Sequence, residues 1–387
     1  MKIVIIGNFR PDAQESMLRF AGMLGTGLGA RGWSVVHAEP RPVFARLARP
    51  YRYGGLPKYL GYVDKFVLFP RALRRVLEKE SPAAVHIVDH ANAPYAAACG
   101  SRAVLTTCHD LLQIRAARGE IPQQRLTKMG TRYQGWILNH IGQSRRVACV
   151  SEETLHHLLR LAPLPRERVS VVPNALNYPY RPVPRAEAWR HVQRWPELAA
   201  RIGADPKTGA GYLLNVGGGQ WYKNRRGLLA IFAQLRAAPG MPQTLVMVGK
   251  PLSEADAALA RQLGVDQDIV SVTGISNEDL QALYSAAEGL LFPSWEEGFG
   301  WPIAEAQACG CPVFTTNRAP MTDVGGDAAA YFDPTSEPSA AQRILAAWPT
   351  RPEMSARGLR AAKRWSLDTM LDRYEALYRE LGGAGTS

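Results

Sequence analysis

Two hydrophobic patterns alternate along the chain. Short continuous apolar runs rich in β-branched residues are typical of strands buried on both faces of a sheet. Longer segments, in which apolar residues recur three and four positions apart, are typical of helices that cover such a sheet. The predicted strands form a first series at residues 3–6, 84–88, 103–107, 147–150 and 169–172 and a second series at residues 212–216, 244–248, 269–272, 289–292 and 312–315.

Helices are predicted between these strands, so the two series together predict an α/β protein with two doubly wound parallel sheets. Two cores are expected because a single hydrophobic core stops growing near about 250–300 residues, whereas this chain has 387. The clearest helical segments are residues 12–30, 153–161, 225–235, 254–263 and 277–286.

The boundary between the two domains is visible in the sequence. The first series of strands ends just before Pro173-Asn174, and a stretch rich in Pro, Arg and Trp follows, up to about residue 211. We therefore predict domains at residues 1–173 and 174–366. A last helix, at about residues 367–381, has no strand after it and must pack outside the regular alternation.

Composition narrows the class of protein. Hydrophobic residues make up 46% and charged residues 21%, which is typical of a packed globular protein. No apolar run approaches the roughly 18–20 residues that span a bilayer, and the first run, at residues 3–6, is too short for a signal peptide. The five cysteines contain no C-x-x-C pair, which argues against a disulfide framework or a zinc site and favours a reducing cytoplasm.

The net charge of +12 is unevenly distributed. Residues 1–173 carry 25 Lys and Arg against 12 Asp and Glu, whereas residues 174–387 carry 21 against 22. A basic first half indicates an anionic partner, such as a membrane surface, nucleic acid or a phosphorylated substrate. The alternative is an ordinary solvated basic face.

The segment after the strand at 289–292 carries candidate chemistry. In open parallel sheets, ligands bind where loops leave the carboxyl ends of the strands. Here Glu297 precedes Gly298-Phe299-Gly300, Pro302 suits the first turn of a helix, and Glu305 follows within that helix. The glycines let a ligand approach the backbone, and the free N–H groups of a helix start favour an anion or a hydroxyl-rich ligand. The alternative is a helix start whose acidic residues only complement the helix dipole.

A second glycine loop follows the strand at 212–216. Gly217-Gly218-Gly219 leads to Lys223-Asn224 at the start of a helix, a pattern typical of a phosphate cradle. It lacks the Gly-Lys-Ser/Thr of a Walker A loop. The alternative is a flexible turn with a surface lysine.

Polar residues also follow the strands of the first half. Gly7-Asn8 ends the first strand, Asp89-His90 the second, and His109-Asp110 the third. The first of these loops lacks the G-x-G-x-x-G fingerprint of nicotinamide-binding proteins. His109 at a strand end faces the crevice, but a lone histidine more commonly bonds a neighbouring backbone group.

Together these residues resemble the retaining glycosyltransferases of family 4, which have the two-Rossmann architecture called GT-B. The resemblance covers essentially the whole chain, and its most specific part is the E-x7-E motif from Glu297 to Glu305, with the family's E-G-F-G start. The other matches are residues 306–313 after that motif, Lys223-Asn224 in the phosphate-lysine segment, residues 171–174 at the crossover between domains, residues 324–334 in a late loop, and His109-Asp110 at the family's active-site histidine.

The resemblance implies a role for each of these residues. Glu305 would bind the ribose hydroxyls of a nucleotide diphosphate sugar and Glu297 the hydroxyls of its sugar. The N–H groups of residues 298–300 would face the sugar and diphosphate, while Lys223, beside Gly217 and Asn224, would offset charge on the leaving diphosphate. An acceptor would lie near Gly7 and His109, and the helix at about 367–381 would pack back towards the first domain.

One position departs from the family pattern. Many members have an arginine two positions after the valine that Val216 matches, and here that position is Gly218. The missing positive charge is expected from Lys250 or from backbone N–H groups; the alternative is that the leaving group is stabilised less strongly. Asp266-Gln267-Asp268 spells a D-x-D metal motif of another glycosyltransferase fold, but it precedes a strand at the wrong end. We interpret it as a turn and expect no catalytic metal and no cofactor besides the donor.

The implied function is the transfer of mannose, glucose or a similar sugar, with retention, to a hydroxyl of a saccharide or lipid-linked acceptor in cell-surface polysaccharide assembly. Two other functions stay open: a GT-B-type sugar-nucleotide epimerase, and an inactive glycosyltransferase-like subunit, which Gly218 favours.

The basic first half also suggests where the protein works. Basic residues interleaved with aromatic residues suit the anionic inner face of the cytoplasmic membrane. Nucleic acid is not expected, because no recognition motif accompanies the charge. The residues are Arg41, Arg46, Arg49, Arg52, Lys58, Lys65, Arg71, Arg74 and Arg75, with Tyr51, Tyr53, Tyr59, Tyr62, Phe66 and Phe69.

Overall fold

The computed structural model describes residues 1–48, 55–205 and 210–383. The chain forms two compact units, one of Met1–Asn177 with Leu367–Ser387 and one of Tyr178–Ser366. The division after Asn177 comes four residues later than the boundary expected from Pro173-Asn174. Each unit contains a six-stranded parallel sheet with helices around it, which confirms the predicted fold class.

The sheet of the first unit has the strand order β2-β1-β3-β4-β5-β6. Buried apolar clusters line it, one around Val4, Val85 and Leu73 and another around Val147, Ile141 and Leu158. The strands are β1 (Lys2–Ile6), β2 (Ser34–Ala38), β3 (Ala84–Ile87), β4 (Val104–Cys108), β5 (Arg146–Cys149) and β6 (Val169–Val171).

The helices of the first unit include one irregular segment. Residues Asp64–Leu68 form a π-helix between α2 and α3, a conformation that is rare and frequently found at functional sites. The α-helices are α1 (Glu15–Ala30), α2 (Gly55–Val63), α3 (Phe69–Glu80), α4 (Leu112–Ala117), α5 (Lys128–Ile141), α6 (Glu152–Leu161) and α16 (Leu367–Gly383).

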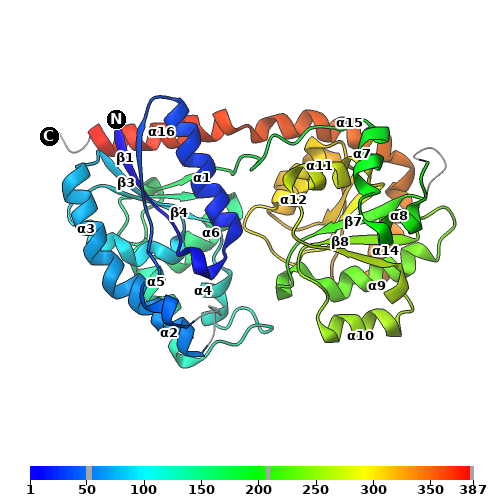
Figure 1. Cartoon of the computed structure of the whole chain (residues 1–387), viewed down its shortest axis with the longest axis horizontal. Coiled ribbons are helices and arrows are strands. Elements are labelled where there is room, and N and C mark those ends of the chain that lie inside the picture. Colours follow the sequence, from blue (N-terminus) through cyan, green and yellow to red (C-terminus); the bar gives the residue numbers. More distant parts are fainter. Residues whose placement is uncertain (49–54, 206–209, 384–387) are drawn as a thin grey trace. The chain divides into compact units, whose positions relative to one another are not determined.

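Helix α16 is fastened to the first unit by charge and by buried polar contacts. Arg31, after α1, pairs with Asp368 at 2.7 Å and Asp372 at 2.6 Å, and α16 lies beside α1 in Figure 1. Inside the unit, the His86 ring lies between the Tyr378 hydroxyl and Thr107, each at 2.7 Å. The last helix of the chain is therefore part of the core of the unit that contains its first residues.

The sheet of the second unit has the order β12-β11-β10-β7-β8-β9. Its strands are β7 (Tyr212–Val216), β8 (Thr244–Val248), β9 (Ile269–Val272), β10 (Gly289–Phe292), β11 (Val313–Thr316) and β12 (Ala329–Phe332). Its helices are α7 (Arg185–Val192), α8 (Pro196–Ile202), α9 (Arg225–Arg236), α10 (Glu254–Gln262), α11 (Asn277–Ala286), α12 (Trp301–Ala308), α13 (Met321–Gly325), α14 (Glu337–Ala347) and α15 (Arg351–Ala361).

The ten predicted strands are present, but each sheet has a sixth strand that the hydrophobic pattern does not indicate. These are β2 and β12, and both lie at an edge of a sheet. Most of their residues are only partly buried, so neither contains the continuous apolar run that marks an inner strand. None of the helices in the described ranges is long and apolar enough to cross a membrane.

Candidate functional site

The loops after β7 and β10 meet because these two strands are neighbours in the sheet of the second unit. The backbone N–H of Trp295 donates to the carbonyl of Tyr222 at 2.7 Å, and the Asn224 amide donates to the carbonyl of Pro293 at 3.1 Å. Asn224 adopts a left-handed conformation, and its side chain also caps α9 by accepting from the Gly227 N–H. The two predicted motifs are thus parts of one site.

Lys223 and Glu297 form an ion pair at the centre of this site. The Lys223 ammonium lies 2.7 Å from Glu297 Oε1, and both side chains are largely buried. The ammonium also lies 5.0 Å from the centre of the Phe292 ring. A largely buried pair of this kind holds both groups in one place, where a bound ligand can exchange contacts with either of them.

The glycines at this edge of the sheet differ in how much space surrounds them. A Cβ at Gly217 would come within 3.3 Å of Lys223 Cδ, so a side chain there would crowd the lysine. A Cβ on Gly249, which follows β8 with φ of 132°, would lie 2.2 Å from the Gly217 carbonyl. At Gly218, by contrast, the nearest atoms belong to the flexible Gln220 side chain, 2.3 Å from a built Cβ.

Arg225 is one of two residues of this site that the sequence did not reveal. Arg225 is only 7% exposed, and its guanidinium donates to the carbonyls of Pro251 at 2.7 Å, Gly217 at 3.4 Å and Lys250. Burial lowers the pKa of Arg225. The arginine therefore ties the loop after β7 to the loop after β8, whereas the Lys250 side chain is exposed. A basic residue at a helix start, where the dipole disfavours it, is the signal that marks Arg225.

The Gly298–Gly300 segment is held in place by aromatic packing and by the start of α12. The Phe299 ring is buried and packs edge-on against Trp365 at 5.1 Å between ring centres. Gly300 has φ of 99° and caps α12, which begins with Trp301-Pro302 as expected. Ser294, two residues after the end of β10, is 1% exposed, and within the described part of the chain its hydroxyl has no hydrogen-bond partner. The packing of Phe299 and the start of α12 therefore hold the glycine segment in place.

Glu305 lies in the second turn of α12 and is 4% exposed. The hydroxyl of Tyr284 donates to Glu305 Oε2 at 2.9 Å. Burial raises the pKa of Tyr284 well above its ordinary value, so this hydroxyl stays protonated and remains a donor. Tyr284 on α11 is a second residue that the sequence analysis missed, because it looks like any aromatic core position.

The polar residues of the first unit gather at the carboxyl edge of its sheet. The Asn8 amide donates to Asp89 Oδ2 at 2.5 Å, and the Gly7 N–H donates to the carbonyl of Ala38 at 2.9 Å. Asn8 Oδ1 is buried and has no partner among the described residues. The ends of β1 and β3 thus contribute to one polar cluster, as expected from their adjacency.

His109 is bound within the protein. Its Nε2 lies 2.8 Å from the carbonyl of Val88, so Nε2 carries the proton, and burial lowers the pKa of the ring. Phe20 packs edge-on against the ring at 4.8 Å between centres. This is the backbone-bonded arrangement left open as the alternative for His109, and in it Nε2 is not available as a base.

The D-x-D sequence forms a short 3-10 turn, Asp266–Asp268, before β9. Asp268 pairs with Arg201 at 3.7 Å and with Arg236. Among the described residues there is no group of three or more His, Cys, Asp or Glu side chains that is arranged to hold a metal ion.

Two family models match this chain. The model described as Glycosyltransferase Family 4 matches residues 18–178, and the model described as Glycosyl transferases group 1 matches residues 210–348. The O-antigen chain mannosyltransferase B of Escherichia coli is 31% identical over 269 residues, which are 68% of this chain and 66% of that relative. The D-inositol 3-phosphate glycosyltransferase of Nocardia farcinica is 29% identical over 238 residues, 59% of this chain and 48% of that relative. The chain thus matches between about half and two thirds of the length of these curated relatives.

A solved structure extends the similarity of fold over the whole chain. Sucrose-phosphate synthase from Thermosynechococcus elongatus superposes with a TM-score of 0.76 at 19% identity, covering 99% of this chain and 100% of that chain. The two family models match one unit each, and the similarity to the Escherichia coli mannosyltransferase covers 68% of the chain. The chain therefore belongs to the family 4 glycosyltransferases with the GT-B fold.

Proposed function

We propose that the protein is a retaining glycosyltransferase that moves a hexose from a nucleotide diphosphate donor to a hydroxyl of a saccharide or lipid-linked acceptor. The observation that carries this proposal is the Lys223–Glu297 pair beside the glycine loop, in the same unit as Glu305. The printed name of the Escherichia coli relative, a mannosyltransferase of O-antigen chains, supports mannose as a donor sugar and cell-surface polysaccharide as the product.

The chemistry proposed for the second unit is electrostatic. Glu305 binds the ribose hydroxyls, and Glu297 binds the hydroxyls of the transferred sugar. As the bond to the anomeric carbon breaks, negative charge grows on the departing diphosphate, and the Lys223 ammonium stabilises it without a metal ion. The diphosphate oxygen takes the proton of the acceptor hydroxyl on the same face of the sugar, so the configuration is retained.

Arg225 is a candidate source of the positive charge that an arginine at position 218 supplies in many family members. Its guanidinium lies against the glycine loop: Nη1 is 3.5 Å from where a Cβ of Gly219 would be. We propose that it adds positive potential at the diphosphate site while holding the loop, so that the site does not depend on the exposed Lys250.

A turnover assay with a panel of nucleotide sugars tests this function. We expect release of nucleoside diphosphate only when a hydroxyl acceptor is present. Conversion of the donor sugar without an acceptor would instead identify the epimerase. Nucleotide binding with no conversion of donor under any acceptor would identify the inactive subunit.

We also propose that the enzyme works in the cytoplasm and touches the inner face of the cytoplasmic membrane through its first unit. The large exposed apolar side chains of that unit concentrate in the basic segment after β2: they include Val43, Phe44, Leu47, Leu56, Tyr59 and Val67. Of the residues expected there, Lys65 is buried and pairs with Asp12 at 2.7 Å, and Phe69 is buried, so neither belongs to this surface. Arg49, Tyr51, Arg52 and Tyr53 lie outside the described residues.

Co-sedimentation with vesicles tests the membrane contact. Each basic residue near an anionic surface contributes about 1 kcal/mol, so binding to anionic vesicles at low salt and release at high salt are expected. Equal recovery with neutral and anionic vesicles would remove the membrane contact and leave the transferase proposal intact.

A further inference from the structure

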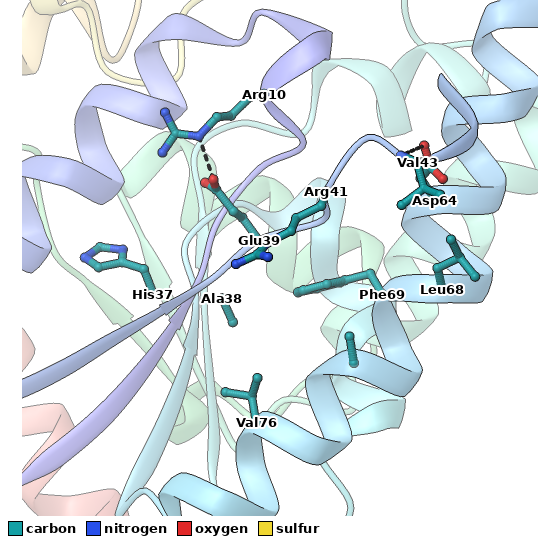
Figure 2. Close-up of a pocket in the computed structure, with 11 residues that line it drawn as sticks. Arg10, His37, Ala38, Glu39, Arg41, Val43, Asp64, Leu68, Phe69 and Val76 are labelled. Atoms are coloured by element: carbon teal, nitrogen blue, oxygen red, sulfur yellow. Dashed lines mark hydrogen bonds and ion pairs between the residues drawn. The ribbon is translucent and has the colours of Figure 1, made fainter. Parts of the chain in front are cut away.

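A pocket of about 470 Å³ opens in the first unit beside the end of β2. Its size lies within the roughly 300–1,000 Å³ of small-molecule sites. One wall is the π-helix and α3, which present Leu68, Ala72 and Val76 at intervals of four residues, together with Phe69. Figure 2 shows the side chains of Phe69 and Val76 pointing towards the segment that follows β2.

The acidic residue Asp64, which lines the pocket, has its hydrogen-bond partners within the protein. Asp64 is buried, and its carboxylate accepts the N–H groups of Val43 at 3.0 Å, Phe44 at 2.9 Å and Ala45 at 2.9 Å. It therefore fixes the segment that forms the rim, and the three N–H dipoles partly offset its negative charge.

The two arginines that line the pocket differ in their partners. Glu39 is held by the Arg10 guanidinium at 2.5 Å, a pair that Figure 2 shows at the edge of the pocket. Arg41 lines the same pocket, and in residues 1–48, 55–205 and 210–383 its guanidinium makes no hydrogen bond or ion pair. Glu39 is thus paired with Arg10 and Asp64 is bonded to backbone N–H groups, so within the described residues the exposed Arg41 is the arginine of this pocket that has no partner, and it lies beside the apolar wall.

We propose that this pocket binds a phosphate group carried on an alkyl or isoprenoid chain, with the phosphate on Arg41 and the chain against Leu68, Phe69 and Val76. Arginine suits this role because its planar fork of N–H donors matches a phosphate. The exposed Val43 and Phe44 beside the mouth would continue the apolar surface outwards. The identification of this ligand as the lipid-linked acceptor rests on the proposed function. It is supported by Glu39, which lines the pocket and also lies beside Gly7, where the acceptor is expected: Glu39 Cβ is 3.8 Å from where a Cβ of Gly7 would lie.

Equilibrium binding of octyl phosphate to the full chain, without any donor, tests the pocket separately from transferase activity. Octyl glucoside supplies the same chain without the charge, and inorganic phosphate supplies the charge without the chain. We expect octyl phosphate to bind at least about tenfold more tightly than either, since a hydrogen bond to a charged group and an apolar contact both contribute. Equal affinity for octyl phosphate and either partial probe would overturn the proposal.

Two pairs of variants locate the binding. Arg41→Gln should weaken octyl phosphate binding by about tenfold or more, whereas Arg75→Gln, which removes an exposed charge of α3 outside the pocket, should not. Ala72→Phe fills the pocket on an exposed face of the helix and should abolish binding, whereas Ala72→Ser keeps the space and should not. Unchanged binding in Arg41→Gln and Ala72→Phe would assign the affinity to the exposed apolar surface and contradict the pocket. Failure of either test leaves glycosyl transfer untouched.

Discussion

Lys223 and Glu297 are 74 positions apart in sequence, yet their charged groups lie 2.7 Å from each other. They are brought together because β7 and β10 are neighbours whose loops leave the same edge of the sheet. In the proposed mechanism Glu297 binds the sugar and Lys223 the diphosphate, and without a donor the two charged groups stabilise one another. The pair explains how the site can keep two largely buried charges in place.

Replacing Glu297 by Ala should slow transfer more than it weakens donor binding. The carboxylate is proposed to contact the sugar that moves, and hydrogen bonds to charged groups contribute roughly 1.5–3 kcal/mol, or about 10–150-fold in rate. Steady-state kinetics separate the effects on kcat and KM. The control Glu353→Gln alters an exposed acid on α15. Wild-type kcat in Glu297→Ala would remove the glutamate from the reaction.

Arg225→Met should loosen the loops after β7 and β8. The substitution keeps the bulk of the side chain but leaves the carbonyls of Gly217, Lys250 and Pro251 without their donor. An unsatisfied buried group costs about 1–3 kcal/mol, so the unfolding midpoint should fall and the dissociation constant of the donor should rise.

The neighbouring Arg226 provides the control for that experiment, because it is exposed. Arg226→Met should stay within about 0.5 kcal/mol of the wild type. If the two variants behave alike, Arg225 does not hold the loops.

Stability should fall as the pH is lowered through the window set by His86. Burial lowers the pKa of His86 to about 3, whereas the unfolded value is 6.5. Between these values the unfolded chain binds a proton that the native protein excludes, so unfolding becomes easier by up to about 1.4 kcal/mol for each pH unit. Urea midpoints from pH 7 to about 4 measure the effect.

His86→Gln removes this titration and should give a shallower dependence on pH, whatever its effect on stability at neutral pH. His156→Gln, which replaces an exposed histidine of α6, should keep the wild-type dependence. A His86→Gln slope as steep as that of the wild type would show that other groups dominate acid unfolding.

Transfer should persist in EDTA. The proposed mechanism places the Lys223 ammonium where other enzymes place a metal ion, so chelation removes nothing on which the leaving diphosphate depends. Initial rates with and without EDTA make the comparison. Complete loss of activity that magnesium or manganese restores would contradict the mechanism.

The inner strands and the edge strands β6 and β9 could be predicted from their apolar runs, whereas the edge strands β2 and β12, most of whose residues are not buried, could not. The adjacency of Lys223 and Glu297 was expected only in outline, from the rule that loops meet at the carboxyl ends of strands. The bond from Tyr284 to Glu305 and the three contacts of Arg225 depend on side-chain packing between separate elements. Neither leaves a periodic signal in the sequence. The same holds for the pocket beside Arg41, whose walls come from segments about 30 residues apart.

Calorimetric titration of wild type and Glu305→Ala with a panel of nucleotide sugars tests the central claim most directly, because the claim is that the second unit holds the donor through its acidic motif. We expect the wild type to bind one of them at a single site and Glu305→Ala to bind it about 10–150-fold more weakly, with Glu353→Gln unchanged. Equal affinity in wild type and Glu305→Ala, or no binding of any nucleotide sugar by the wild type, would contradict the account.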